Sequence, residues 1–209
     1  MKYIIMCGGK YSTKTNPSLL KVHGETLVER TIRLLRDNGV NDIAISSNSD
    51  SFNEFGVEVL HHENYDLDDE RFRWLYAFYP MGLPVCYLYG DVVYSPDAIH
   101  TIVNKEVDDI EFFASAKPFD SQYKKSFEEP FAFKVVDTKR FFDCVQKTLD
   151  YEDEQCFGRV AISWELWQVI KKTPLNIIKY NYTAINDYTC DVDSEADIKY
   201  FEKLLEGKI

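Results

Sequence analysis

Short apolar runs alternate with amphipathic segments along the first half of the chain. Residues 3–7 form an unbroken apolar run, and residues 43–45 and 85–89 form two more. Runs of this length are typical of strands that are buried on both faces of a parallel sheet. Between the first two runs, residues 27–35 repeat apolar side chains at the spacing of an amphipathic helix. The pattern therefore predicts strands and helices in alternation.

The same pattern continues, less regularly, to the end of the chain. The remaining expected strands are residues 57–60, 112–114, 131–136, 177–180 and 190–193, and the remaining expected helices are residues 72–79, 96–103, 138–150, 163–172 and 197–205. Strand–helix–strand alternation implies right-handed crossovers, so we expect a Rossmann-like α/β fold with a mixed, mostly parallel sheet and helices on both faces. Because no repeat, low-complexity tract or linker interrupts the sequence, we expect residues 1–209 to form a single domain.

Charge and cysteine content narrow the class of protein. A formal net charge of -11 opposes general binding to nucleic acids or anionic membranes. No apolar stretch approaches the ~18 residues of a membrane span, and five cysteines without a CxxC spacing favour reduced thiols over disulfides or a zinc ribbon. The sequence therefore predicts a soluble cytoplasmic protein. Nucleotide binding remains compatible with the negative charge, because backbone N–H groups and bound Mg²⁺ can neutralise phosphates.

The loop after the first strand carries candidate phosphate-binding residues. In a parallel sheet, ligands bind beyond the carboxyl ends of the strands. Glycines there let the backbone approach phosphate oxygens, and hydroxyl and ammonium groups add donors. The candidates are Gly8, Gly9, Lys10, Ser12 and Lys14. The loop matches neither the P-loop pattern nor G-x-G-x-x-G, and a solvated turn that needs glycine only for its backbone is an equally good interpretation.

Three aspartates are candidate metal ligands. Asp91 follows Gly90 at the end of a predicted buried strand, and Asp191 and Asp193 are two residues apart, which puts both on one face of an extended segment. Carboxylates that converge repel one another unless a cation lies between them, and Mg²⁺ prefers one or two carboxylates together with phosphates. A turn role for Asp91 and a helix-capping role for Asp193 are the alternatives, and the combination favours metal binding.

Read together, these segments resemble the nucleotidyltransferase family, which comprises sugar-phosphate pyrophosphorylases and bacterial phosphocholine cytidylyltransferases. The family's G-G-x-G-[ST]-R loop is similar to residues 8–13 (GGKYST), and its following Pro-Lys pair, apolar segment and helix are similar to residues 20–32 (LKVHGETLVERTI). Gly90-Asp91 resembles its metal-binding aspartate, and residues 191–198 (DVDSEADI) resemble the acidic segment that supplies further metal ligands in the phosphocholine type.

The resemblance implies a nucleotide-diphospho-sugar transferase type of fold and an enzyme that moves a nucleotidyl group. A nucleoside triphosphate would react with a small phosphorylated acceptor, and pyrophosphate would be released. Mg²⁺ would be held by Asp91, Asp191 and Asp193. Elements that bind the acceptor would lie within residues 110–186, where the likeness in sequence is thin.

The resemblance also assigns roles to basic residues. Lys21 would contact the α-phosphate or the acceptor phosphate. Thr13 stands where the family has an arginine, so Lys14 or Lys10 would supply a positive charge there, although an ammonium group lacks the two-pronged geometry of guanidinium. Asn48, after the second strand, is a candidate for reading the base, although a turn that ends a strand needs no further function.

Two other functions remain open from the sequence. The Asp191-x-Asp193 spacing fits the D-x-D motif of nucleotide-sugar-dependent glycosyltransferases of related fold, and the missing arginine fits a nucleotide-binding module without turnover. CMP is the favoured group because of the phosphocholine-type ending, with GMP and UMP as alternatives. A homodimer is also open, because the sequence does not define the oligomeric state.

Overall fold

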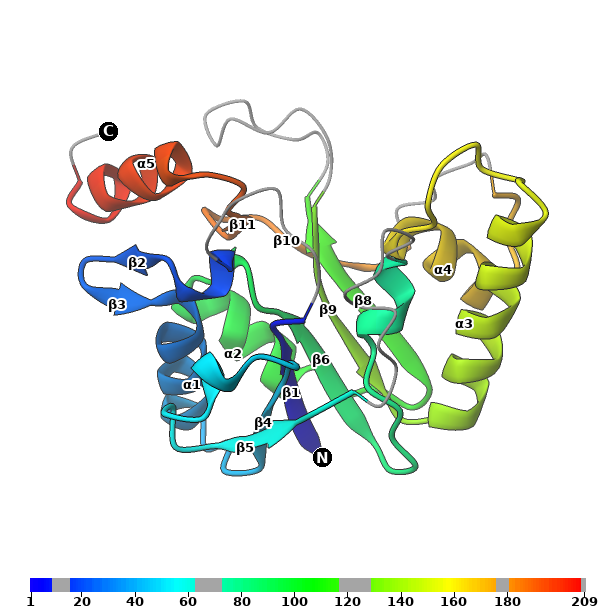
Figure 1. Cartoon of the computed structure of the whole chain (residues 1–209), viewed down its shortest axis with the longest axis horizontal. Coiled ribbons are helices and arrows are strands. Elements are labelled where there is room, and N and C mark those ends of the chain that lie inside the picture. Colours follow the sequence, from blue (N-terminus) through cyan, green and yellow to red (C-terminus); the bar gives the residue numbers. More distant parts are fainter. Residues whose placement is uncertain (9–15, 63–72, 117–128, 176–180, 208–209) are drawn as a thin grey trace.

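A seven-stranded mixed sheet forms the centre of the protein (Figure 1). The computed structural model describes residues 1–8, 16–62, 73–116, 129–175 and 181–207. The strand order is β10-β8-β9-β6-β1-β4-β5. In chain order the strands are β1 (Lys2–Met6), β4 (Ile43–Ser46), β5 (Glu58–Leu60), β6 (Val85–Tyr89), β8 (Ile110–Ser115), β9 (Pro130–Val135) and β10 (Thr183–Ile185). Within this sheet β9 runs antiparallel to both of its neighbours, whereas the other pairs are parallel.

Helices cover both faces of the sheet, as Figure 1 shows. On one face α1 (Leu27–Asp37) and α2 (Pro96–Asn104) pack with Ile5 of β1 in one apolar cluster. On the other face α3 (Thr138–Asp153) and α4 (Ser163–Ile170) pack with Ile4 in a second cluster. Successive β1 side chains thus point into opposite layers, as the period of a strand requires. The predicted α/β fold, with a mostly parallel sheet and helices on both faces, is confirmed.

A third apolar cluster lies beside the sheet. Here α5 (Glu195–Leu205) packs on two short antiparallel pairs, as seen at the upper left of Figure 1. The pairs are β2 (Lys21–Val22) with β3 (Glu25–Thr26), and β7 (Val92–Val93) with β11 (Cys190–Asp191). Short 3-10 helices lie at Pro17–Leu19 (η1), Asp50–Phe52 (η2) and Trp74–Ala77 (η4). Among the described residues, no helix has the length and apolarity that crossing a membrane requires.

The hairpin before α1 was not expected from the sequence. His23 (φ 52°) and Gly24 (φ 83°) form its turn, and both have the left-handed conformation that a tight hairpin turn uses. Thr26 then caps α1, because its hydroxyl accepts a hydrogen bond from the Glu29 N–H while the Glu29 carboxylate accepts from the Thr26 N–H. The hairpin thus lies between η1 and the capped start of α1.

Two other expected elements differ from the structure. The helix expected over residues 72–79 is, in its described part, only the 3-10 turn η4, because Pro80 disfavours helical geometry at the residue before it and cannot donate a helical hydrogen bond. Its first expected residue, Phe72, lies outside the described residues. So does the strand expected over residues 177–180, and the described edge strand is β10, which sequence reasoning missed.

Candidate active site

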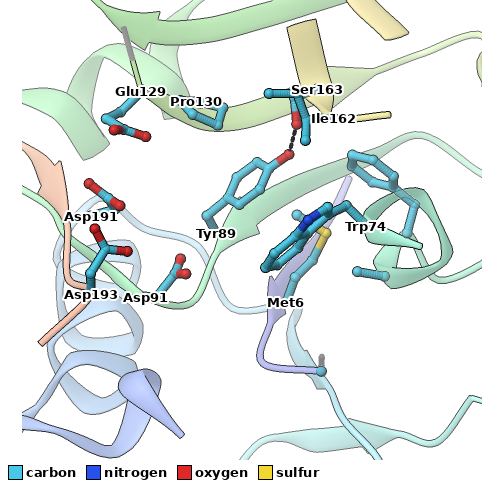
Figure 2. Close-up of a pocket in the computed structure, with 13 residues that line it drawn as sticks. Met6, Trp74, Tyr89, Asp91, Glu129, Pro130, Ile162, Ser163, Asp191 and Asp193 are labelled. Atoms are coloured by element: carbon cyan, nitrogen blue, oxygen red, sulfur yellow. Dashed lines mark hydrogen bonds between the residues drawn. The ribbon is translucent and has the colours of Figure 1, made fainter. Parts of the chain in front are cut away.

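A cavity of about 300 Å³ lies where β1 and β6 end, at the carboxyl side of these parallel strands. Figure 2 shows that one end of this cavity is acidic and the other is aromatic and apolar. The lining residues are Met6, Gly8, Trp74, Ala77, Phe78, Tyr89, Asp91, Glu129, Pro130, Ile162, Ser163, Asp191 and Asp193. This position agrees with the rule that α/β sheets bind ligands beyond the carboxyl ends of their strands.

Gly90 places Asp91 at the cavity by letting the end of β6 pack against the end of β1. The Gly90 N–H donates to the Met6 carbonyl over 3.0 Å. A Cβ atom on Gly90 would lie 2.6 Å from that carbonyl oxygen, 2.7 Å from the Cys7 sulfur and 2.7 Å from the Ser18 hydroxyl oxygen. Only glycine fits such a close approach. The chain then turns directly into Asp91, whose side chain lines the acidic end.

The pairing of β7 with β11 brings the C-terminal aspartates to Asp91. Asp191 lies opposite Val92, and the Val192 N–H donates to the Asp91 carbonyl over 2.8 Å. Val192 is buried in the third apolar cluster, so its neighbours Asp191 and Asp193 point the other way, toward the cavity. The Asp193 N–H also donates to the Asp197 carboxylate at the start of α5, which fixes the backbone there.

The acidic end holds Asp91, Asp191, Asp193 and Glu129 together (Figure 2). These four carboxylates line one partly enclosed space, where groups of like charge favour a bound cation. Within the described ranges, no group of three or more His, Cys, Asp or Glu side chains is already close enough to hold a metal ion. A Mg²⁺ ion needs only one or two carboxylates when phosphate oxygens complete its shell.

The charge of Asp91 acts on the buried groups around it. Burial raises the pKa of the Cys7 thiol to about 12; the nearby Ser18 hydroxyl opposes this increase, and the Asp91 charge adds to it. Burial likewise raises the pKa of the Tyr89 and Tyr94 phenols, with Asp91 again contributing. These groups therefore stay neutral at physiological pH and add no negative charge to the acidic end.

The other end of the cavity is aromatic and apolar. The Tyr89 hydroxyl and the Ser163 hydroxyl form a hydrogen bond with each other, drawn in Figure 2. Trp74 is 42% exposed although it is a large apolar side chain, and Phe78 and Ile162 lie on the same wall. An exposed tryptophan inside a pocket offers an aromatic face to a ligand.

The predicted nucleotide loop is described only at its two ends. Gly8 lines the cavity. The Asn16 side chain donates to the Cys7 carbonyl over 2.8 Å and accepts from the Ser18 N–H over 3.0 Å, so the loop leaves and re-enters the fold at one place. The predicted residues Gly9, Lys10, Ser12 and Lys14 lie outside the described residues.

Two predicted residues lie away from the lining of the cavity. Lys21 begins β2 with an exposed side chain. Asn48 follows β4, and its side-chain oxygen accepts a hydrogen bond from the His62 N–H over 2.7 Å, which is a structural use of the amide. Trp164 and Trp167 are 6% and 1% exposed and are core residues.

Several lining residues were not singled out from the sequence, and four of these carry a polar group or a large aromatic ring: Tyr89, Trp74, Glu129 and Ser163. Tyr89 had a usable signal, because it precedes Asp91 by two residues and strand alternation favours the same side for both. Ser163 and Glu129 lie in the interval 110–186, which the resemblance links to acceptor binding. Trp74 had no local signal, because its place in the cavity depends on tertiary packing of the η4 turn.

Sequence searches find no matching protein-family model and no matching curated protein. The fold, in contrast, is that of the nucleotidyltransferases. The CTP:phosphocholine cytidylyltransferase from Streptococcus pneumoniae has a TM-score of 0.57 and 16% identity, with 98% of each chain covered.

Two further solved structures are similar over nearly the whole chain. A protein assigned as a glucose-1-phosphate thymidylyltransferase from Bacillus anthracis, in complex with sucrose, has a TM-score of 0.60 and 14% identity, with 97% of this chain and 94% of that chain covered. The inositol-1-phosphate CTP transferase from T. maritima has a TM-score of 0.54 and 15% identity, with 100% of this chain and 97% of that chain covered. At these identities the likeness shows a shared fold.

Proposed function

We propose that the protein is a Mg²⁺-dependent nucleotidyltransferase that joins a nucleoside monophosphate to a small phosphorylated acceptor and releases pyrophosphate. One observation carries this proposal. Asp91, Asp191 and Asp193, which are distant in sequence, line one cavity beside Gly8 at the carboxyl ends of β1 and β6. The nucleotidyltransferase fold supports the same reaction, because the three similar structures are named for nucleotidyl transfer from CTP or to a sugar phosphate.

The reaction is an in-line displacement at the α-phosphorus. An oxygen of the acceptor phosphate attacks the α-phosphorus and forms a new P–O bond. The bond from the α-phosphorus to the oxygen that bridges to the β-phosphate breaks, and pyrophosphate leaves with that electron pair. Because the acceptor phosphate is an anion at neutral pH, no general base is needed. The protein contributes positioning and neutralisation of charge.

The residues at the acidic end fit Mg²⁺ in donor chemistry. Asp91, Asp191 and Asp193 offer carboxylate oxygens, which are the ligands that Mg²⁺ prefers, and one or two of them suffice when phosphate oxygens complete the shell. Bound Mg²⁺ would polarise the α-phosphate and neutralise part of the triphosphate charge. Glu129 lines the same end and is a further acidic neighbour of this site.

Residues of the opening loop would hold the triphosphate. Gly8 and Gly9 would let the backbone approach the phosphates, and Lys10, Ser12 and Lys14 would donate to them. Lys21, at the start of β2, would contact the α-phosphate or the acceptor phosphate. Asn48 would contact the base. We favour CTP as the donor because the ending at residues 191–198 is of the phosphocholine type.

The aromatic end of the cavity favours an acceptor with an ammonium group. Trp74, 42% exposed, lies on the wall of this end, and an aromatic ring attracts an ammonium group through a cation–π contact. A hydroxyl-rich sugar is a poorer match for this end of the cavity, because Trp74, Phe78 and Ile162 form its wall. A phosphorylated amino alcohol is therefore the proposed acceptor class.

Pyrophosphate release tests the proposal. The protein is incubated with Mg²⁺, each of the four nucleoside triphosphates, and phosphocholine, phosphoethanolamine, glucose 1-phosphate or inositol 1-phosphate. Acceptor-dependent pyrophosphate release with CTP and an ammonium-bearing acceptor, abolished by EDTA, is the expected result. If no pair releases pyrophosphate above the control without acceptor, nucleotidyl transfer is refuted.

A glycosyltransferase is a second candidate, because the Asp191-x-Asp193 spacing of D-x-D motifs lies on the cavity wall. The two activities consume different donors. Turnover of a nucleotide-sugar in the absence of triphosphate would support glycosyl transfer. Binding of CTP without turnover of either donor would indicate a nucleotide-binding module.

A further inference from the structure

Two segments far apart in sequence form the walls of the aromatic end. Trp74 belongs to η4, whereas Ile162 and Ser163 belong to the connection from α3 to α4 and the first turn of α4. In Figure 2 the Ile162–Ser163 pair lies next to the Tyr89 hydroxyl, and Trp74 lies below and to the right of Tyr89. The width of this end therefore depends on whatever holds η4 and the α3–α4 connection at a fixed separation.

Glu152, in the last turn of α3, connects the two walls. One oxygen of its carboxylate lies 2.8 Å from the Arg73 Nε, and Arg73 immediately precedes Trp74. The other oxygen accepts a hydrogen bond of 2.7 Å from the Ala161 N–H, and Ala161 immediately precedes Ile162. Each oxygen of this single carboxylate thus holds the residue next to one wall of the cavity.

This bridge is less exposed than a surface ion pair. The side chains of Arg73 and Glu152 are 18% and 11% exposed. The same helix carries an ordinary surface pair, Lys139 with Asp143, whose side chains are 85% and 65% exposed. Charge-assisted hydrogen bonds in a poorly solvated place hold their geometry, whereas exposed pairs contribute little.

The wall that Ala161 leads into is fixed on its far side as well. The Glu165 carboxylate accepts from the Ile162 N–H over 2.9 Å and pairs with Arg159 over 2.7 Å. Ser163 therefore starts α4 in a defined position, where its hydroxyl reaches the Tyr89 hydroxyl. A displacement of Ala161 would be passed to Ile162 and Ser163, because these two residues follow it directly in the chain.

We propose that Glu152 is a positioning residue that sets the separation between Trp74 and the Ile162–Ser163 wall, and thereby the affinity for the acceptor. Glu152 is not among the residues that line the cavity, so it acts through its two neighbours and not on substrate. This inference rests on the proposed function, because the aromatic end binds the acceptor only if the protein is a transferase of the proposed kind.

Steady-state kinetics of three variants test the positioning role. Glu152→Ala removes both bonds, and Glu152→Gln keeps an acceptor for the Ala161 N–H but removes the charge that pairs with Arg73, which retains its ion pair with Asp153. Asp143→Asn, on the same helix, is the matched control. We expect Glu152→Ala to raise the acceptor KM about tenfold, because small displacements of a binding wall have large effects. The acceptor KM of Glu152→Gln should lie between those of the wild type and Glu152→Ala. The triphosphate KM of all three variants should stay within about twofold of the wild-type value.

Fluorescence quenching gives a readout that does not need turnover. Trp74 is 42% exposed, whereas Trp164 and Trp167 are 6% and 1% exposed, so acrylamide reports mainly on Trp74. We expect the quenching constant of Glu152→Gln and Glu152→Ala to change by about half or more, and that of Asp143→Asn to match the wild type. Circular dichroism checks that each variant is folded, and Glu152→Gln decides the outcome if Glu152→Ala does not fold.

The two readouts separate the possible failures. If folded Glu152 variants match Asp143→Asn in both acceptor KM and quenching, the positioning role is refuted. If the wild type transfers no nucleotidyl group to any acceptor, the proposed function fails, and unchanged quenching in the Glu152 variants would refute the bridge on its own. An equal rise of the acceptor and triphosphate KM values would also refute it, because a general loss of structure would explain both.

Discussion

Replacement of Gly90 by alanine perturbs the contact that carries Asp91 to the cavity. The new methyl group would lie 2.6 Å from the Met6 carbonyl oxygen and 2.7 Å from both the Cys7 sulfur and the Ser18 hydroxyl. All three atoms belong to buried residues near the ends of β1 and η1, so none can move aside as a flexible surface side chain would. The ends of β1 and β6 must therefore separate.

The cost follows from two contributions. Overpacking of a tight core contact costs about 1–3 kcal/mol. Separation of the strands also weakens the hydrogen bond from the Gly90 N–H to the Met6 carbonyl, 3.0 Å long in the structure, which adds about 1 kcal/mol. We therefore expect Gly90→Ala to lower the free energy of unfolding by about 2–4 kcal/mol, and to reduce nucleotidyl transfer because Asp91 shifts.

Urea denaturation followed by circular dichroism measures this difference. Gly82→Ala is the matched control, because no atom lies within 4 Å of the position that its new methyl group would take, and its φ is not in the left-handed region. The control should stay within about 0.5 kcal/mol of the wild type. A Gly90→Ala protein that is as stable as the Gly82→Ala protein would show that the strand ends are not packed as described.

Three further substitutions should change stability or acceptor binding in a defined direction. Burial lowers the pKa of His62 from 6.5 to about 4, so the stability from its neutral ring is present above pH 6.5 and is lost as the pH falls toward 4. Between pH 7.5 and pH 4.5 the free energy of unfolding of the wild type should therefore fall by about 2–3 kcal/mol more than that of His62→Gln. Lys134 donates to three carbonyls at the end of α2, so Lys134→Met should lower the free energy of unfolding in urea by about 1–3 kcal/mol. The Lys139 side chain is 85% exposed, so Lys139→Met should leave this free energy almost unchanged. Trp74→Ala should raise the KM for an ammonium-bearing acceptor about 5–30-fold, whereas Trp74→Phe should retain most of the affinity. Equal KM values in Trp74→Ala and the wild type would show that Trp74 does not bind the acceptor.

The central strands and the acidic end were accessible to sequence reasoning for physical reasons. A short, unbroken apolar run such as residues 3–7 is typical of a strand that is buried on both faces. Alternation put Asp191 and Asp193 on one side of Val192, and the structure has both aspartates on the cavity and Val192 in the core. Rules of this kind depend only on neighbouring residues in the chain, so they hold whatever tertiary contacts the segment makes.

Other parts of the fold depend on contacts that no local rule reports. The β7–β11 pair is two residues on each side, and it exists because the chain after Asp91 meets the C-terminal segment at the edge of the third apolar cluster. The aromatic wall is similar, because Trp74 reaches the cavity only through the η4 turn that Pro80 helps to shape. The sequence therefore indicated the acidic end but not the aromatic end of the cavity.

Joint binding of Mg²⁺ and a triphosphate by Asp91, Asp191 and Asp193 can be measured by calorimetric titration of CTP, with and without Mg²⁺ and without acceptor. We expect Mg²⁺-dependent binding to the wild type, and binding weakened about tenfold or more in Asp91→Asn and Asp193→Asn, because each replacement removes a metal ligand. The exposed Asp143→Asn control should bind like the wild type. Equal Mg²⁺-dependent affinity in the wild type and Asp91→Asn would contradict a metal site at this edge of the sheet.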